Sequence, residues 1–244
     1  MVKKVIAAIA AAMFAGSVIV SLAIAKTVPV KVSTASAYEP VLDPSNFVRV
    51  IDNPYYPLPV GRVLIYKGTR DGVKQIDRVT VTSRTRILEG VTATTVLDVA
   101  RQPDGTLLES TKDWYAQDGQ GNVWYVGEDT KAYNPDGTVD TSGSWLAGVN
   151  DGEPGIIMEA HPQIPDAYRQ EFLAGQAEDT AWTVQLGGSV TVPYGRVRRV
   201  LTSLEATVVE PGSYDQKIYA PGLGIVLEHS LTGREDSKLV RVKN

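Results

Sequence analysis

Four carboxylates and four aromatic side chains stand close together within residues 113–129, a stretch typical of a β-hairpin. If side chains alternate between the two faces of the hairpin, Asp113 and Glu128 share a face with Tyr115 and Trp124 and lie diagonal to one another. Diagonal positions are about 7–8 Å apart, and side-chain rotation brings such carboxyl groups into the roughly 5–9.5 Å range of two-carboxylate glycoside hydrolysis. The pair is therefore a candidate acid and base beside two rings on which a sugar could stack.

The pairing across the hairpin decides whether this set exists. A turn at residues 118–121 makes Tyr115 face Trp124 and Trp114 face Tyr125, so that each face of the hairpin receives one aromatic pair. These four rings are candidate ligand-binding residues. A three-residue turn would shift the pairing and separate the set, and the two acids would then be ordinary strand residues.

A second group of candidate residues surrounds His161. This histidine stands in an irregular segment and could act as an acid–base residue or simply cap backbone groups. The chain holds two histidines, which excludes a site of several His, and no spacing supports a metal site. Tyr168, Arg169 and Glu171 could bind a carboxylate or phosphate through the guanidinium fork. The alternative is an ion pair of Arg169 with Glu171 or Glu159.

Other motifs are incomplete. Residues 118–122 alternate polar side chains with glycine but lack the remaining acidic ligands of a calcium loop, and a tight turn is the better interpretation. The glycine-rich stretches do not introduce helices as phosphate loops do, and residues 142–144 lack a nucleophile elbow. The sequence therefore predicts no metal and no cofactor.

The elements that must position these residues are antiparallel strands. Turn signals recur about every 10–20 residues with β-branched runs between them, which favours a meander over βαβ units. We therefore predict a mainly β fold, an antiparallel barrel or half-barrel. Residues 142–165 interrupt the pattern and predict a long irregular lid segment. Residues 165–177 could begin a helix at Pro165 and Asp166 or alternate as a strand, and we favour a strand or short extended segment. Strands are predicted over residues 62–68, 74–83, 91–102, 106–117, 189–193, 197–209, 214–220, 224–232 and 238–242.

The N-terminal residues predict export. Lys3 and Lys4 precede a charge-free apolar run that ends in the Ala-x-Ala triplet of residues 23–25, which is typical of a secretory signal peptide over residues 1–25. A second Ala-x-Ala triplet at residues 35–37 is an alternative cleavage site, and an uncleaved N-terminal anchor is the alternative to cleavage. We expect residues 26–45 to be a flexible leader and residues 46–244 to be a single β-rich domain. The expected location is secreted or periplasmic, and the absence of Cys excludes disulfides and a lipid-modified cysteine.

Charge restricts the partners. The formal net charge of −4 becomes −6 once Lys3 and Lys4 leave with the signal peptide, and the signs are mixed along the chain. This argues against nucleic acid or an anionic membrane surface as the partner. The expected partner is a small molecule, lipid-like or a glycan, with an envelope protein bound at an edge strand as an alternative.

Four blocks carry a resemblance: residues 113–129, 155–179, 190–196 (VTVPYGR) and 219–228 (YAPGLGIVLE). They resemble blocks of a family of uncharacterised secreted bacterial β-rich proteins, over about residues 46–243. The last two blocks also resemble wider groups of exported proteins with lipocalin-like or LolA-like half-barrels. The resemblance implies an exported β fold and transfers no catalytic residue.

The function expected from the sequence is an exported ligand-binding barrel for a small apolar or amphiphilic molecule. One alternative is a secreted carbohydrate-active hydrolase that uses Asp113 and Glu128, with His161 as a further candidate. The other alternative is an envelope protein-interaction module.

Overall fold

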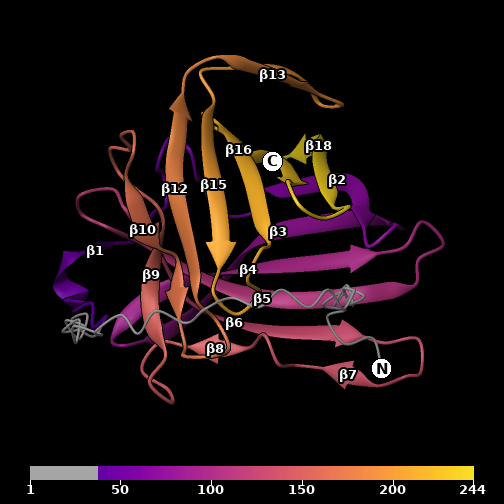
Figure 1. Ribbon diagram of the computed structural model, residues 1–244. Coiled ribbons are helices and arrows are strands. Elements are labelled where there is room, and N and C mark those ends of the chain that lie inside the picture. Colours follow the sequence, from indigo (N-terminus) through magenta and orange to yellow (C-terminus); the bar gives the residue numbers. More distant parts are fainter. Residues whose placement is uncertain (1–37) are drawn as a thin grey trace, which may run out of the picture.

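One antiparallel sheet carries nearly all of the chain in the computed structural model, which describes residues 38–244. Its strands follow the order β10-β12-β15-β16-β17-β18-β2-β3-β4-β5-β6-β9-β11. Strands β12, β15 and β16 cross over the layer formed by β3 to β6 (Figure 1). The elements are η1 (Pro44–Asn46), β1 (Phe47–Val48), β2 (Val63–Arg70), β3 (Val73–Leu88), β4 (Val91–Arg101), β5 (Leu107–Asp118), β6 (Val123–Tyr133), β7 (Val139–Asp140), β8 (Trp145–Leu146), β9 (Glu153–Met158), β10 (Ala167–Arg169), β11 (Glu171–Phe172), β12 (Asp179–Leu186), β13 (Ser189–Val192), β14 (Gly195–Arg198), β15 (Leu201–Thr207), β16 (Tyr214–Ala220), β17 (Gly224–Ser230) and β18 (Asp236–Lys243).

The sheet curls until its two ends meet along residues 167–172. Strand β10 pairs with β12 at one end of the strand order, and β11, which follows it directly, pairs with β9 at the other end. Gly155 of β9 lies so close to this segment that an added Cβ atom would be 2.2 Å from the backbone carbon of Gln170. The sheet is therefore a nearly closed barrel, and the predictions of a mainly β barrel-like fold and of an extended segment here are confirmed.

Turn chemistry explains why the long hairpins form where they do. At the β4–β5 turn, the Asp104 carboxylate accepts the Thr106 N–H at 2.9 Å, and Gly105 has a φ of +94°. Pro103 precedes these two residues and fixes its own φ near the value that a turn requires. The strands predicted over residues 91–102 and 106–117 are confirmed, and this Pro-Asp-Gly sequence joins them.

The segment 142–165 differs from its prediction. It contains two strands, β8 and β9, and both pair with β6. Trp145 is 3 % exposed and Met158 is 0 % exposed, because these apolar residues are anchored in the barrel wall. The expectation of one continuous irregular lid is therefore corrected: only the connections around the two strands are irregular.

The buried apolar residues form two clusters. The larger one includes Tyr115, Tyr125 and Tyr219, and the smaller one includes Leu64 and other residues of β2, β17 and β18. The two-stranded β13–β14 hairpin packs on the smaller cluster (Figure 1, upper part).

The predicted signal peptide and most of the predicted leader lie outside the described residues. Within the described part of the leader, the Tyr38 hydroxyl donates to the Pro154 carbonyl at 2.9 Å, and Leu42 packs against the larger cluster. Over residues 38–244, no helix is long and apolar enough to cross a bilayer.

Candidate functional site

The β5–β6 hairpin brings the candidate acids together by a route that the sequence did not predict. Three residues, not two or four, separate the paired residues Asp118 and Asn122, and Tyr115 pairs with Tyr125 instead of Trp124. A further register shift between Trp114 and Tyr115 then places Asp113 directly opposite Glu128. The predicted pairing is therefore wrong by one residue near the turn, and the two acids are opposite rather than diagonal.

Asp118 sets the length of this turn. Its Oδ1 atom accepts three consecutive backbone N–H groups, those of Gln120, Gly121 and Asn122, at 3.0, 2.9 and 2.9 Å. Gly121 has a φ of +101°, which a residue with a side chain rarely adopts. These bonds hold a three-residue turn, so the register follows from the Asp118 side chain.

Tyr125 takes the place that was predicted for Trp124. Its hydroxyl lies 2.7 Å from Asp113 Oδ1 and 3.0 Å from Glu128 Oε2. The Tyr115 ring stacks on the Tyr125 ring with centroids 4.9 Å apart. The inner set is therefore Asp113, Glu128, Tyr115 and Tyr125.

The two hairpin tryptophans point to the other face. Trp114 donates its ring N–H to Thr95 Oγ1 at 3.1 Å, and the Arg86 guanidinium lies 4.4 Å from the Trp114 ring centroid. Trp124 donates to Asp118 Oδ2 at 2.9 Å and contacts Phe47 edge to face. Both rings stabilise the outside of the hairpin, and the structure does not bring them to the inner acids.

The bridging hydroxyl implies a proton on one of the two acids. Tyr125 has one hydroxyl hydrogen, so a second hydrogen bond to its oxygen needs a proton from a carboxyl group. Burial raises the pKa of Asp113 to about 7, against the lowering effect of the Tyr125 hydrogen bond. Burial, and then the charges of Glu171 and Asp113, raise the pKa of Glu128 to about 9. At neutral pH Glu128 therefore holds the proton and donates to Tyr125, which donates to Asp113.

A third acid, Glu171, belongs to the same group. Its Oε2 atom accepts the Trp145 ring N–H at 2.6 Å, and the Trp145 ring stands at 89° to the Tyr125 ring with centroids 5.4 Å apart. Trp145 lies opposite Glu128 in the β6–β8 pairing. Sequence analysis did not single out Trp145, whose only signal was a large apolar residue inside a predicted irregular segment.

The predicted anion site of Tyr168, Arg169 and Glu171 does not form. Arg169 lies 3.7 Å from Glu178 Oε2, with its guanidinium 4.6 Å from the Phe172 ring centroid. Its ion-pair partner is thus neither of the two acids predicted. Burial raises the pKa of Tyr168, with the Glu205 charge as the next cause. Tyr168 and Arg169 face opposite sides of the sheet because they are consecutive strand residues. The Glu171 carboxylate accepts the Trp145 ring N–H instead.

His161 lies away from the acids. It is exposed in the loop after β9, and the neighbouring Ala160 N–H donates to Asn122 Oδ1 at 2.8 Å at the turn end of the hairpin. Asp113 and Glu128 lie farther along the strands. The described part of the chain contains no group of three or more His, Cys, Asp or Glu that could hold a metal ion.

The inner face carries a diagonal line of four carboxyl groups, one from each of four adjacent strands. Glu128 on β6 pairs with Asp113 on β5, and Asp113 pairs with Val96, two residues from Asp98 on β4. Asp98 pairs with Val79, two residues from Asp77 on β3. Burial, and then a hydrogen bond to Asp77 and its charge, raise the pKa of Asp98 well above its usual range. We call this set the carboxyl line.

Each end of the carboxyl line adjoins a hollow. The Glu128 depression, about 270 Å³, lies where β6 passes from its pairing with β8 to its pairing with β7, and its apolar wall includes Leu146, Val149 and Leu173. The Asp77 cavity, about 130 Å³, is polar and also includes Asp98.

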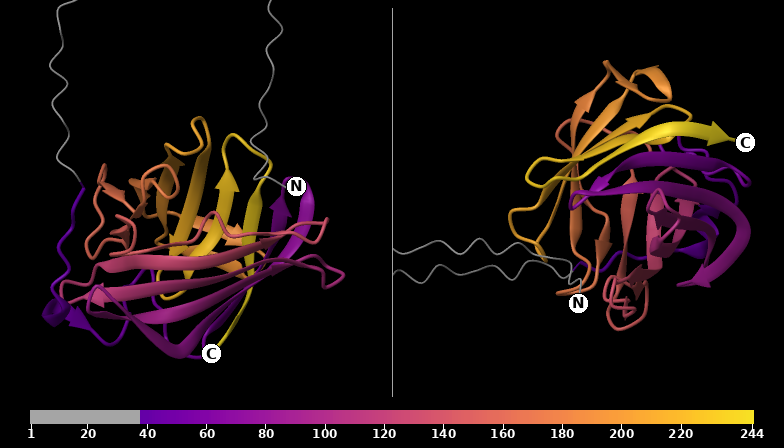
Figure 2. Two further views of the ribbon diagram at one scale, coloured as in Figure 1. Left: turned by 90° about the horizontal axis from the view of Figure 1, so that it is seen from below. Right: turned by 90° about the vertical axis from the view of Figure 1, so that its right-hand side faces the viewer.

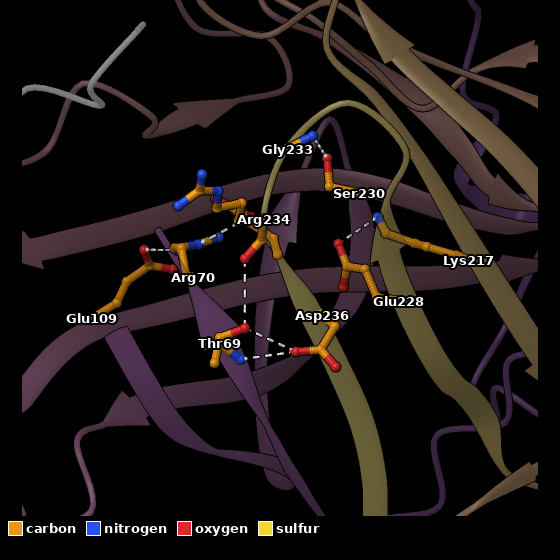
Figure 3. Close-up of polar contacts among 10 residues, drawn as sticks. Thr69, Arg70, Glu109, Lys217, Glu228, Ser230, Gly233, Arg234 and Asp236 are labelled. Carbon is orange, nitrogen blue, oxygen red and sulfur yellow. Dashed lines mark hydrogen bonds and ion pairs between the residues drawn. The ribbon is translucent and has the colours of Figure 1, made fainter. Parts of the chain in front are cut away.

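Arg70 and Lys217 are already paired with acids (Figure 3). Arg70, at the Asp77 cavity, lies 3.0 Å from Glu109 Oε2 and 3.6 Å from Glu235 Oε2. Lys217 lies 2.6 Å from Glu205 Oε2 and 4.0 Å from Glu228 Oε1. Neither cation pairs with a member of the carboxyl line among the described residues.

The geometry of the two central acids does not suit glycoside hydrolysis. The Tyr125 hydroxyl occupies the space between Asp113 and Glu128, where a sugar ring would have to stand. Asp113 is 9 % exposed and does not line the Glu128 depression. The arrangement is better suited to holding a charged or hydrogen-bonding group at Glu128.

No protein-family model and no curated protein matches the chain. Two solved structures match the chain. The putative exported protein with YmcC-like fold from Bacteroides fragilis is 15 % identical, with 78 % of this chain and 99 % of that chain covered and a TM-score of 0.46. The putative lipoprotein from Parabacteroides distasonis is 13 % identical, with the same coverage and a TM-score of 0.41.

Proposed function

We propose that the protein is an exported binding protein for a small amphiphilic molecule with an ammonium head group. The observation that carries the proposal is the position of Glu128, which stands both at the end of the carboxyl line and in the Glu128 depression. Leu146 and Leu173 form an apolar wall beside it. A single ligand could therefore neutralise Glu128 with its head group and cover this wall with its apolar part.

The charge of the head group follows from the carboxyl line. A buried carboxyl group ionises at a cost, and a cation beside it removes that cost. Arg70 and Lys217 are engaged by other acids. Arg86 also lines the depression, but its guanidinium lies over the Trp114 ring and forms no ion pair with Glu128 among the described residues. An incoming ammonium group would therefore be the first cation to pair with Glu128. Binding would therefore displace the proton that Glu128 holds at neutral pH and release it to solvent.

The size of the ligand follows from the hollow. About 270 Å³ is slightly below the roughly 300–1,000 Å³ of typical ligand pockets. A short alkyl chain or a single ring would fill it, whereas a two-chain phospholipid would not. Export is supported by the N-terminal pattern of Lys3, Lys4 and the charge-free run that follows.

The test compares three ligands that share one short alkyl chain and differ in head group: an amine, a carboxylate and an alcohol. We expect calorimetry to show binding of the amine alone, with proton release and with an affinity that increases as pH rises towards 9, the pKa of Glu128. Glu128→Gln should weaken amine binding roughly tenfold to a hundredfold, the range of a charge-assisted hydrogen bond.

The matched control is Glu39→Gln, the same chemical change at an exposed position. It should leave amine binding unchanged. Equal affinity for all three ligands would contradict specificity for an ammonium group. Tighter binding of the carboxylate would contradict the proposed charge of the head group. An unchanged affinity in Glu128→Gln would show that the amine binds elsewhere.

A further inference from the structure

The same strands that carry acids on their inner face carry bases on their outer face. Across β18, β2, β3, β4, β5 and β6, the register aligns outward side chains in rows. One row passes through Arg241, Ile65, Arg78, Val99, Ser110 and Lys131, and the next through Lys243, Val63, Thr80, Leu97, Lys112 and Asp129. A third passes through Lys238, Lys67, Ile76, Arg101 and Leu107, and a short fourth through Asp236, Thr69 and Lys74. We call these rows the outer basic face.

Cations dominate this face. It holds nine basic residues and two acids, Asp129 and Asp236. Each acid is paired with a lysine, Asp129 with Lys112 and Asp236 with Lys238. None of the other seven cations has a carboxylate partner among the described residues, and all seven are exposed. The face is therefore strongly positive on a chain whose formal net charge is −4.

Apolar side chains stand between the cations. Ile65 lies between Arg241 and Arg78 in its row, and Ile76 lies between Lys67 and Arg101. All of the apolar members of the three longer rows are at least partly shielded from solvent, because long basic side chains cover apolar neighbours while their charged ends stay in water. Such a mixture is typical of surfaces that lie at a bilayer interface.

The cations are spread in two dimensions. At about 4.8 Å between strands, six strands extend about 24 Å across the face. Strands β3 to β6 lie side by side as one broad layer in Figure 2 (left). An extended plane of charge fits another plane, whereas a single polymer chain would need the cations aligned along a groove.

We propose that the outer basic face docks on a bilayer surface that contains anionic phospholipids. Lys and Arg near such a surface are attracted by its negative potential, and the attraction falls off within a Debye length. The apolar side chains between them would enter the headgroup region. Docking on this face leaves the inner carboxyl line on the opposite side of the same strands, and the Glu128 depression reaches the outer basic face at Asp129.

The test is vesicle co-sedimentation of the full chain. One set of vesicles contains phosphatidylcholine alone, and the other contains equal parts of phosphatidylcholine and phosphatidylglycerol. The test variant is Lys67→Gln, Arg78→Gln and Arg241→Gln together, and the control variant is Arg49→Gln, Arg198→Gln and Arg234→Gln together. All six residues are exposed, and both variants change the net charge equally.

We expect the natural chain to bind the anionic vesicles more strongly than the neutral ones, and added salt to remove the difference. The test variant should lower the partition coefficient on anionic vesicles by on the order of a hundredfold, and the control variant should not. The N-terminal apolar run is common to all chains and cancels from the comparison. Circular dichroism melts should be equal because the substituted side chains are exposed.

Three results would overturn the proposal. Equal binding of the natural chain to both vesicle types would show that charge is not recognised. Equal losses in the two variants would show that net charge, and not this face, matters. Binding of soluble heparin without binding of anionic vesicles would show that the face recognises an anionic polymer instead of a bilayer.

Discussion

The Tyr125 hydroxyl joins Asp113 and Glu128 across two strands, at 2.7 Å from Asp113 Oδ1 and 3.0 Å from Glu128 Oε2. The pair is held so closely because a register shift between Trp114 and Tyr115 places the two acids directly opposite each other. A single hydroxyl hydrogen cannot serve two carboxylates, so this contact couples the proton on Glu128 to the charge on Asp113.

Tyr125→Phe should raise the pKa of Asp113 above its value of about 7. The hydroxyl lowers that pKa by donating to the carboxylate, and the phenyl ring keeps the stack on Tyr115 while removing the donor. We expect a loss of about 1–2 kcal/mol in the free energy of unfolding at neutral pH. Carboxyl carbon NMR titration and urea unfolding measure the two effects. Tyr214→Phe, at an exposed position, is the control, and an Asp113 titration that does not move would contradict the assigned role.

Stability should decrease as pH rises from about 5 to about 8. Asp113 and Glu128 have pKa values near 7 and 9 in the folded chain, above the ordinary values of 3.8 and 4.5, so the folded state binds their protons more tightly than the unfolded state does. The stabilisation is complete below the ordinary values and is lost as pH passes the raised ones. Urea unfolding should show a decrease on the order of 6 kcal/mol in the free energy of unfolding over this range.

A matched variant separates these acids from the rest of the chain. Asp113→Asn together with Glu128→Gln removes both titrations, so the pH profile should become flatter. Glu159, whose pKa burial raises to about 7, remains and should keep a residual slope of the same sign. Stability that increases from pH 5 to pH 8 in the natural chain would contradict the raised pKa values.

Most of the long strands could be predicted from the sequence, but β12 was not predicted, and the strand expected over residues 197–209 divides into β14 and β15. The register of the central hairpin could not be predicted either. Alternating apolar runs and the polar, glycine-containing turn at residues 118–121 are local signals, and they placed this hairpin correctly. The register depended on the number of backbone N–H groups that Asp118 accepts and on an irregularity beside Gly127. A φ of +146° at Gly127 favours glycine, yet one glycine in a strand does not reveal a bulge by itself.

The separation of charge between the two faces was hidden in the sequence for a geometric reason. Asp77 precedes Arg78 and Lys112 precedes Asp113, so the signs are mixed along the chain. Because strand residues alternate faces, mixing in sequence becomes segregation in space once the strands are in register. Net charge averages the two faces and therefore could not show that one is acidic and the other basic. Asp77 and Asp98 were missed in this way.

Lys217→Met should destabilise the fold by about 3–5 kcal/mol, the cost of leaving a buried charge without its partner. Lys217 lies 2.6 Å from Glu205 Oε2, and Glu205 is 6 % exposed. Ser203 and Tyr219 donate to the other carboxylate oxygen at 2.8 and 3.2 Å and cannot replace the lost charge. Urea unfolding measures the loss.

A second substitution at Glu205 tests whether the unpaired charge causes this loss. Glu205→Gln added to Lys217→Met removes the stranded charge and keeps a side chain that Ser203 and Tyr219 can contact, so most of the stability should return. If the double variant is as unstable as Lys217→Met alone, the loss comes from packing at Lys217, and the ion pair is not responsible.

Gly155→Ala should open the seam that closes the barrel. An added Cβ atom would lie 2.2 Å from the carbon and 2.3 Å from the oxygen of the Gln170 backbone, and backbone cannot move aside as a flexible side chain can. We expect a loss of about 3 kcal/mol or more in the free energy of unfolding. Faster amide hydrogen exchange over residues 167–172, where the two ends of the sheet meet, would show that the loss of stability is located at this seam. Gly137→Ala is the control: Gly137 has a φ of +84° but nothing within 4 Å, so it should cost only about 1 kcal/mol. Equal losses at the two glycines would mean that β9 and residues 167–172 are not in close contact and that the sheet is open at this seam.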